Sequence, residues 1–176
     1  LRSLSLYGGR SLSLGAGSHG AFGASAYWMS WNPVQMSVAV AHSRRDGYVQ
    51  NTGTGERLDN KDRWSALLRL QKDLVPAKLF LSVTALLQRA QNGEQPMVPL
   101  FGGDHFKVER STQGRSEGHS ANVGGTLTYK APWGNVSSTT SMNDWSLTPY
   151  VSILSFGPME LTNDVSLKQR NFNEEL

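Results

Sequence analysis

Four histidines are the side chains of this sequence best suited to metal or acid–base chemistry. They stand at His19, His42, His105 and His119, far apart, and none lies in His-Glu-x-x-His or another metal-ligand spacing. Asp104 precedes His105 on a glycine-rich segment, so the two could act as a ligand or catalytic pair. A solvated loop pair is the simpler interpretation, and we predict no metal site at the histidines.

The remaining candidates for chemistry are equally weak. Glu56, Asp59 and Asp62 could bind calcium, but they lack the regular ligand spacing of an EF-hand. The chain has no cysteine, which excludes thiolate metal sites and disulfides. There is no G-x-S-x-G, P-loop or Rossmann fingerprint. We therefore predict no catalytic, metal or cofactor-binding residue, and we expect the protein not to be an enzyme.

Composition favours strands over surface helices. Of 176 residues, 18 are glycine and only 18% are charged, and small residues with few charges suit strands and turns. The net charge of +3 is too small for a nucleic-acid-binding face, and its basic clusters are Arg44-Arg45 and Lys168 with Arg170. No stretch of about 18 apolar residues predicts a transmembrane helix, but a membrane strand needs only about 9–11 residues.

Alternation with a period of two is the main signal. Leu12, Leu14 and Ala16 would share one strand face, with Ser11 and Ser13 on the other. The same pattern predicts about eight strands in an antiparallel up-and-down meander, at residues 11–17, 21–31, 35–44, 63–72, 78–89, 120–130, 135–145 and 164–173. Leu67, Phe80 and Leu86 break the polar face of the strands expected at 63–72 and 78–89. Amphipathic helices are the alternative there, because Trp64, Leu67, Leu68 and Gln71 also fit helical spacing.

The connections differ in length. Short turns are expected at Ser18 to Gly20, Asn32-Pro33, Asp73 to Ala77 and Ala131 to Gly134. The links Arg45 to Asp62, Gln91 to Gly118 and Ser146 to Asn163 are long, polar and rich in glycine. Bacterial outer-membrane barrels alternate short periplasmic turns with longer extracellular loops in this way.

Two features favour lipid on the apolar faces. The polar faces carry mostly Ser, Gly, Ala and Thr, unlike the Lys/Glu-rich surface of a soluble strand. Aromatic residues gather near strand ends, as interfacial girdles require, at Trp28, Trp31, Trp64, Tyr129, Trp133 and Trp145. Periodicity alone does not decide which face is outside, so a small soluble β-barrel or β-sandwich that binds a ligand or carbohydrate is the alternative, and a complete eight-stranded membrane barrel is a third.

Four stretches in order resemble the barrel of TonB-dependent receptors. GRSLSLGAGSHGAFGASAYW (Gly9 to Trp28) resembles the first hairpin after the plug domain, and HSRRDGYVQNTGTGERLDNKDRWSALLRLQ (His42 to Gln71) the third strand, its outer loop and the returning strand. PWGNVSSTTSMNDWSL (Pro132 to Leu147) is similar to a periplasmic turn and strand, and NFNEEL (Asn171 to Leu176) to the start of the family's Gln-Glu-Leu strand motif.

The resemblance implies a 22-stranded transmembrane barrel in the bacterial outer membrane, of which residues 1–176 form the N-terminal part. It implies outer-membrane lipid and the TonB complex as partners, and transport of an iron–siderophore, haem, cobalamin or glycan as function. Because the chain opens at Leu1 and shows no plug, TonB box or closing C-terminal strand, we expect a fragment that does not transport alone. The family's ligand contacts do not transfer residue by residue. The links Arg45 to Asp62 and Gln91 to Gly118 are the places to look for substrate binding.

Overall fold

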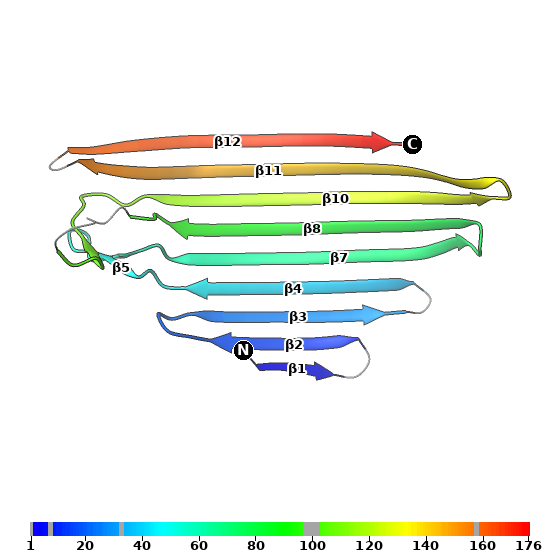
Figure 1. Cartoon of the computed structure of the whole chain (residues 1–176), viewed down its shortest axis with the longest axis horizontal. Coiled ribbons are helices and arrows are strands. Elements are labelled where there is room, and N and C mark those ends of the chain that lie inside the picture. The colour runs from blue at the N-terminus through cyan, green and yellow to red at the C-terminus, as the bar shows by residue number, and fades with distance from the viewer. Residues whose placement is uncertain (1, 7–8, 32–33, 97–102, 157–158) are drawn as a thin grey trace.

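The computed structural model describes residues 2–6, 9–31, 34–96, 103–156 and 159–176. Nine strands form one antiparallel sheet in the order β1-β2-β3-β4-β7-β8-β10-β11-β12 (Figure 1). Every strand pairs with the one before it in this list, which confirms an all-β up-and-down meander. The strands are β1 (Arg2–Leu6), β2 (Arg10–Ala16), β3 (Phe22–Ser30), β4 (Gln35–Arg45), β7 (Lys61–Val75), β8 (Leu79–Gly93), β10 (Arg115–Ala131), β11 (Gly134–Phe156) and β12 (Met159–Glu175).

All eight predicted strands are present as β2, β3, β4, β7, β8, β10, β11 and β12. The helical alternative at 63–72 and 78–89 is wrong, because residues 63–72 lie inside β7 and residues 79–89 inside β8, and these two strands pair with each other. Among the described residues there is no helix long and apolar enough to span a membrane. β1 is an additional strand that the sequence pattern did not indicate.

The expectation of a long loop from Ser146 to Asn163 is wrong. β11 and β12 continue through most of this segment as a paired ribbon, from Leu147↔Leu167 to Phe156↔Met159. Pro149 falls at the register shift between Leu147 and Tyr150. Because proline has no N–H to donate to a ladder, an irregularity of this kind lets it sit in a strand without leaving a partner unpaired.

The two ends of the sheet are built differently (Figure 1). At one end lie the predicted short turns between β7 and β8 and at Pro132-Trp133 between β10 and β11, where Ala131 pairs with Gly134. The Asn32-Pro33 turn lies outside the described residues. At the opposite end, the Ser18 to Gly20 turn is tight, with His19 and Gly20 in the left-handed region at φ of 57° and 62°, as a two-residue hairpin turn requires.

Two long connections occupy that opposite end, which we call the loop end. They follow β4 and β8, as predicted, but they are not irregular throughout. They contain β5 (Val49–Asn51), β6 (Arg57–Leu58) and β9 (Lys107–Val108), which form a second, three-stranded sheet in the order β6-β5-β9. The pairing of β5 with β9 is parallel and joins the two loops.

The main sheet is a single layer without a hydrophobic core. Among the described residues the buried hydrophobic side chains are Leu58 and Ile153, and both lie at the loop end. The chain exposes 12285 Å² of surface, whereas a compact protein of 19.3 kDa exposes about 8,500 Å². A sandwich or a small closed barrel would gather its apolar residues in a dry centre, yet Leu12 and Leu127 are 44% and 41% exposed.

The sheet is open. In the part of the chain that the structure describes, β1 pairs only with β2 and β12 only with β11, and these two edge strands lie on opposite sides of the array (Figure 1). A complete eight-stranded barrel would need its first and last strands to pair. The arrangement is therefore an open sheet with two free edges.

Candidate functional site

One face of the sheet carries a continuous apolar surface, which we call the apolar band. Residues paired across an antiparallel ladder point to the same face, so the register decides its membership. The row Leu12↔Ala26↔Val40↔Ala66↔Leu87↔Ala121 crosses six strands without a polar side chain. The band comprises Leu12, Leu14, Ala24, Ala26, Trp28, Met36, Val38, Val40, Trp64, Ala66, Leu68, Leu70, Leu79, Leu81, Val83, Ala85, Leu87, Ala121, Val123, Leu127 and Tyr129.

The band has the dimensions of a membrane core. On β8 it runs from Leu79 to Leu87, which is about 27 Å along the strand, or about 21 Å of height at a 40° tilt, against about 25 Å for the apolar band of outer-membrane barrels. Its side chains are not covered by a second layer of the described structure: Leu87 is 53% exposed and Val123 is 42% exposed. Polar residues bound the band on both sides, with Arg89 next on β8 toward the loop end and Lys72 next on β7 toward the turns.

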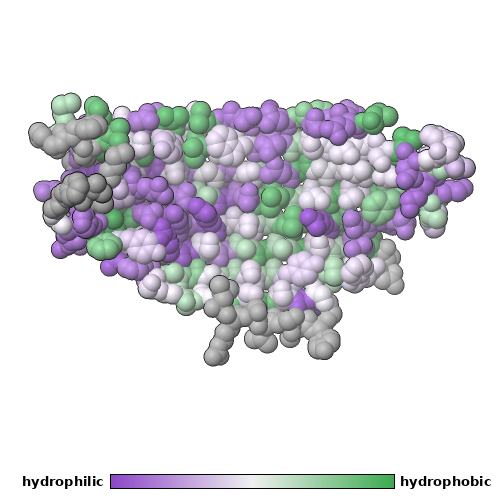
Figure 2. All heavy atoms as spheres, in the orientation of Figure 1, coloured by the Kyte–Doolittle hydropathy of each residue, from purple (hydrophilic) through white to green (hydrophobic). Residues whose placement is uncertain are grey.

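The opposite face, which we call the polar face, is lined by small hydroxyl and amide side chains. They hydrogen-bond across the ladder: Thr126 with Thr139 at 3.1 Å and Thr128 with Ser137 at 3.1 Å. Leu67, Phe80 and Leu86 interrupt this face, as their positions in the sequence predict. Figure 2 shows one face of the molecule, with near-neutral residues over much of its middle and hydrophilic residues dense toward the loop end.

The aromatic residues expected to form a girdle lie at different places on the sheet. Trp64 lies at the loop-end margin of the apolar band and Tyr129 at the turn-end margin. Trp28 lies on the same face but within the band, level with Val38. Trp145 pairs with Ser120 on the polar face, so its assignment to a girdle is wrong. Trp31 and Trp133 lie beside or in turns.

An ionic and aromatic row follows the loop-end margin of the band. His42 stacks on Trp64, with ring centroids 4.0 Å apart and an interplanar angle of 13°, and its Nε2 lies 3.0 Å from Asp62. On β8, Arg89 donates to Glu117 of β10 from Nε at 3.1 Å and from Nη2 at 2.7 Å. His119 Nε2 lies 3.1 Å from the same carboxylate oxygen of Glu117. Two of the four histidines therefore pair with carboxylates at this margin.

A buried ion pair and its hydrogen bonds, which we call the lock, hold the loops at the loop end together. Glu94 and Arg110 have side chains 4% and 2% exposed, with 2.5 Å between the carboxylate and Nη1. Glu94 also accepts from the backbone N–H groups of Gly114 and Ile153, both at 3.0 Å. Arg110 donates to the Ile153 carbonyl at 3.2 Å. These bonds satisfy the buried carboxylate and attach the second loop to β11, as a buried charge requires.

The first loop joins the same lock through Asn51. Its side chain is fully buried, and its Oδ1 accepts from the backbone N–H groups of Gly53 and Arg110, both at 3.0 Å. A Cβ at Gly53 would overlap the Arg110 carbonyl, and one at Gly47 would overlap that of Leu58, so both glycines allow close backbone approach. The described parts of the two loops that the sequence singles out are thus joined to each other.

A hollow of about 380 Å³ lies next to these loops, at the loop ends of β7, β8, β10 and β11. Lys61 and Arg63, which alternate on β7, contribute cations to it, and Asn92 and Ser116 contribute hydrogen-bonding groups. Arg63 is exposed and points to the polar face, since it pairs with Ala90 in the row beside Ser65. Cations with polar neighbours in a concave site suit an anionic or strongly polar ligand.

The other residues singled out by chemistry lie elsewhere. His19 packs edge-on against Tyr48, with ring centroids 4.6 Å apart. Asp104 accepts from the Phe106 N–H at 2.9 Å and pairs with Lys107 at 3.2 Å. Those contacts with nearby loop groups hold the pKa of the Asp104 carboxyl below its ordinary value, the Phe106 bond contributing most.

The three acidic residues considered for calcium do not gather. Asp59 pairs with Arg45 and Lys61, while Asp62 pairs with His42. Within the described ranges there is no group of three or more His, Asp or Glu residues placed to hold a metal ion.

Sequence reasoning missed the buried lock. Asn51, Glu94 and Arg110 lie in links that read only as long and polar, and no spacing connects them. The single available signal is Arg110 itself, one of few basic residues in the second link. The chain matches no family model, no curated protein and no solved structure.

Proposed function

We propose that this chain is part of the β-barrel of an outer-membrane transporter of the TonB-dependent receptor type. In this arrangement the apolar band contacts lipid and the polar face lines the barrel interior. The observation that supports the proposal most is an uncovered apolar band of membrane height on a single-layer sheet. A nonpolar solvent stabilises an apolar face that no second layer covers, and closed barrels are the sheets that satisfy all backbone groups there.

The ends of the sheet support an orientation. Short turns at one end and two long, folded loops at the other match the periplasmic and extracellular sides of bacterial barrels. β10 and β11, with 17 and 23 residues, exceed the 9–11 residues that cross a membrane, so they would extend beyond it toward the loops. The free edges of β1 and β12 suit further strands of a larger barrel better than closure at eight.

The structure at the loop end supports the proposal that the protein binds a ligand for transport. The locked loops form a fixed unit beside the cationic hollow of Lys61 and Arg63. Outer loops that stay ordered can present a preformed site to a scarce ligand, because little ordering entropy is then lost on binding. An iron–siderophore or a similar anionic chelate is the ligand class that we propose.

Single cysteines test the face assignment, because the native sequence has none. Val83→Cys and its neighbour Ser82→Cys point to opposite faces. After reconstitution in lipid vesicles, a water-soluble maleimide should modify Val83→Cys at least about tenfold more slowly than Ser82→Cys, because the reactive thiolate does not form in hydrocarbon. Val38→Cys and Ala39→Cys form a second matched pair on β4.

Equal labelling of both members of each pair would refute the proposal. So would a chain that, expressed without detergent, is a soluble monomer with a cooperative unfolding transition. Such behaviour would favour a soluble ligand-binding or carbohydrate-binding β protein instead.

A further inference from the structure

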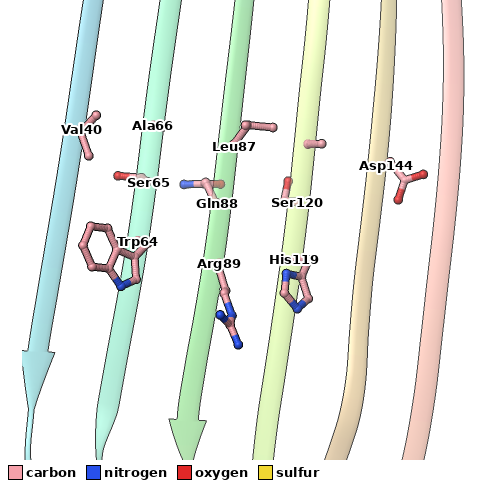
Figure 3. Close-up of a pocket in the computed structure, with 11 residues that line it drawn as sticks. Val40, Trp64, Ser65, Ala66, Leu87, Gln88, Arg89, His119, Ser120 and Asp144 are labelled. Atoms are coloured by element: carbon pink, nitrogen blue, oxygen red, sulfur yellow. The ribbon is translucent and has the colours of Figure 1, made fainter.

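A shallow groove crosses the loop-end margin of the apolar band (Figure 3). It has a volume of about 380 Å³ and spans β4, β7, β8, β10 and β11. Small side chains, Ala66 and Ala121, lie on either side of Leu87 and lower the surface there. Trp64 lines one side of the groove, and Arg89 and His119 lie toward the loop end. The groove is thus apolar toward the middle of the band and charged toward the loop end, where Arg89 and His119 line it. Asp144 also lines the groove and accepts hydrogen bonds from Arg170.

The walls of the groove are held in place. Stacking against His42, which is itself bonded to Asp62, fixes the ring of Trp64. Glu117 holds Arg89 and His119 side by side, and its bonds from Arg89 engage Nε and Nη2. The Nη1 group of Arg89 remains available to a further acceptor, since a guanidinium carries five N–H donors.

A third cation extends the same row. His119 pairs with Ser146, and Ser146 pairs with Lys168 on β12. Three strand spacings separate Arg89 from Lys168, which is about 14 Å. Glu117 offsets the charge of Arg89, and Arg170 offsets that of Asp144, so Lys168 leaves an excess positive charge at the margin of the band.

The groove does not suit a peptide strand. β4, β7, β8 and β10 are paired on both sides over this region, so no backbone edge is free for strand addition. An amphiphile matches both halves of the surface, with an acyl chain over Ala66 and Ala121 and an anionic head at the cations. Paired cations at the level of the headgroups attract anionic lipids.

We propose that this groove binds an anionic phospholipid, with its phosphate on Arg89 and His119, with Lys168 adding positive charge to the same margin, and with an acyl chain along the apolar band. The inference rests on the proposed function, because it requires the band to face lipid. It adds a defined lipid site on the outer wall of the barrel that is separate from the ligand hollow on the polar face.

Quenching of Trp64 by brominated lipids tests the site. The full chain keeps Trp64 alone, with W28F, W31F, W133F and W145F, and is reconstituted in phosphatidylcholine vesicles. A small fraction of brominated phosphatidylglycerol or brominated phosphatidylcholine is then added. Each cation near an anionic headgroup should raise its local occupancy about fivefold, so phosphatidylglycerol should quench Trp64 at a much lower fraction.

Matched variants assign the effect to the row. Arg89→Gln and Lys168→Gln should each reduce the preference for phosphatidylglycerol about fivefold, and Arg89→Lys should keep most of it. Arg63→Gln is the control: Arg63 is next to Trp64 in sequence but on the polar face, so the preference should not change.

The outcomes separate the two proposals. If Trp64 is quenched equally by both brominated lipids, or if Arg63→Gln acts like Arg89→Gln, the lipid site is wrong and the face assignment stands. If neither brominated lipid quenches Trp64, the face assignment itself fails and the lipid site fails with it.

Discussion

An arginine placed at different heights on β8 should report directly what the apolar band contacts. Leu79 and Leu87 mark the two ends of the band on this strand, and Val83 is midway between them, about 14 Å from each along the strand. Val83 pairs with Leu70 and Gly125, so neither of its cross-strand neighbours has a polar side chain. Ser82 points to the polar face, where it pairs with Gln71 and Thr126.

In a bilayer, Val83→Arg should cost about 2–4 kcal/mol of folding free energy, and Leu87→Arg about 0–1 kcal/mol because Leu87 is near the interface. Ser82→Arg should cost within about 0.5 kcal/mol of zero, as at a solvated surface position. A difference of 3 kcal/mol between Val83→Arg and Ser82→Arg corresponds to about 150-fold in the folding equilibrium.

The assay is equilibrium unfolding by urea in lipid vesicles, followed by tryptophan fluorescence, with the cysteine-labelling pattern as a check that each variant keeps the same faces. Two results would refute the reasoning. One is an equal cost at residues 82 and 83, which would mean that both faces meet the same solvent. The other is a cost at Leu87 as large as at Val83, which would mean that there is no gradient of depth.

Three further predictions concern the ends of the sheet. Glu94→Ala should destabilise the loops by about 3–5 kcal/mol because it strands the buried Arg110 cation; hydrogen exchange of residues 103–114 should rise sharply, and Glu94→Leu combined with Arg110→Leu should restore much of the protection. Ala77→Gly should stabilise the turn after β7 by about 1 kcal/mol, since Ala77 is held at a φ of 59° in the left-handed region that favours glycine; an unchanged urea midpoint would contradict this. The depressed pKa of Asp104 means that its bond to Phe106 stabilises the loop above the ordinary value of 3.8 and is lost as the pH falls below it; proteolysis near residue 105 should therefore increase in acid, and Asp104→Asn should remove that pH dependence.

Several structural features were beyond prediction for identifiable reasons. The segment Ser146 to Asn163 reads as a loop because it contains Pro149 and many polar residues, yet long partners on both sides extend β11 through it. The lock of Glu94 on Arg110 joins residues whose burial depends on a parallel contact between β5 and β9. The place of Trp145 near a strand end predicts a girdle position, and only the register with Ser120 puts it on the polar face.

The sequence by itself determined the strands and the composition of their two faces. Successive side chains of a strand point to opposite sides, so the alternation around Leu12, Val38, Leu81 and Leu127 specifies one apolar and one polar face without any tertiary information. Only the tertiary structure decided that these faces align across the main strands into one uncovered band, and that the loops after β4 and β8 lock together. Register and burial depend on which segments meet in space, and the periodicity within one strand does not specify the strand that pairs with it.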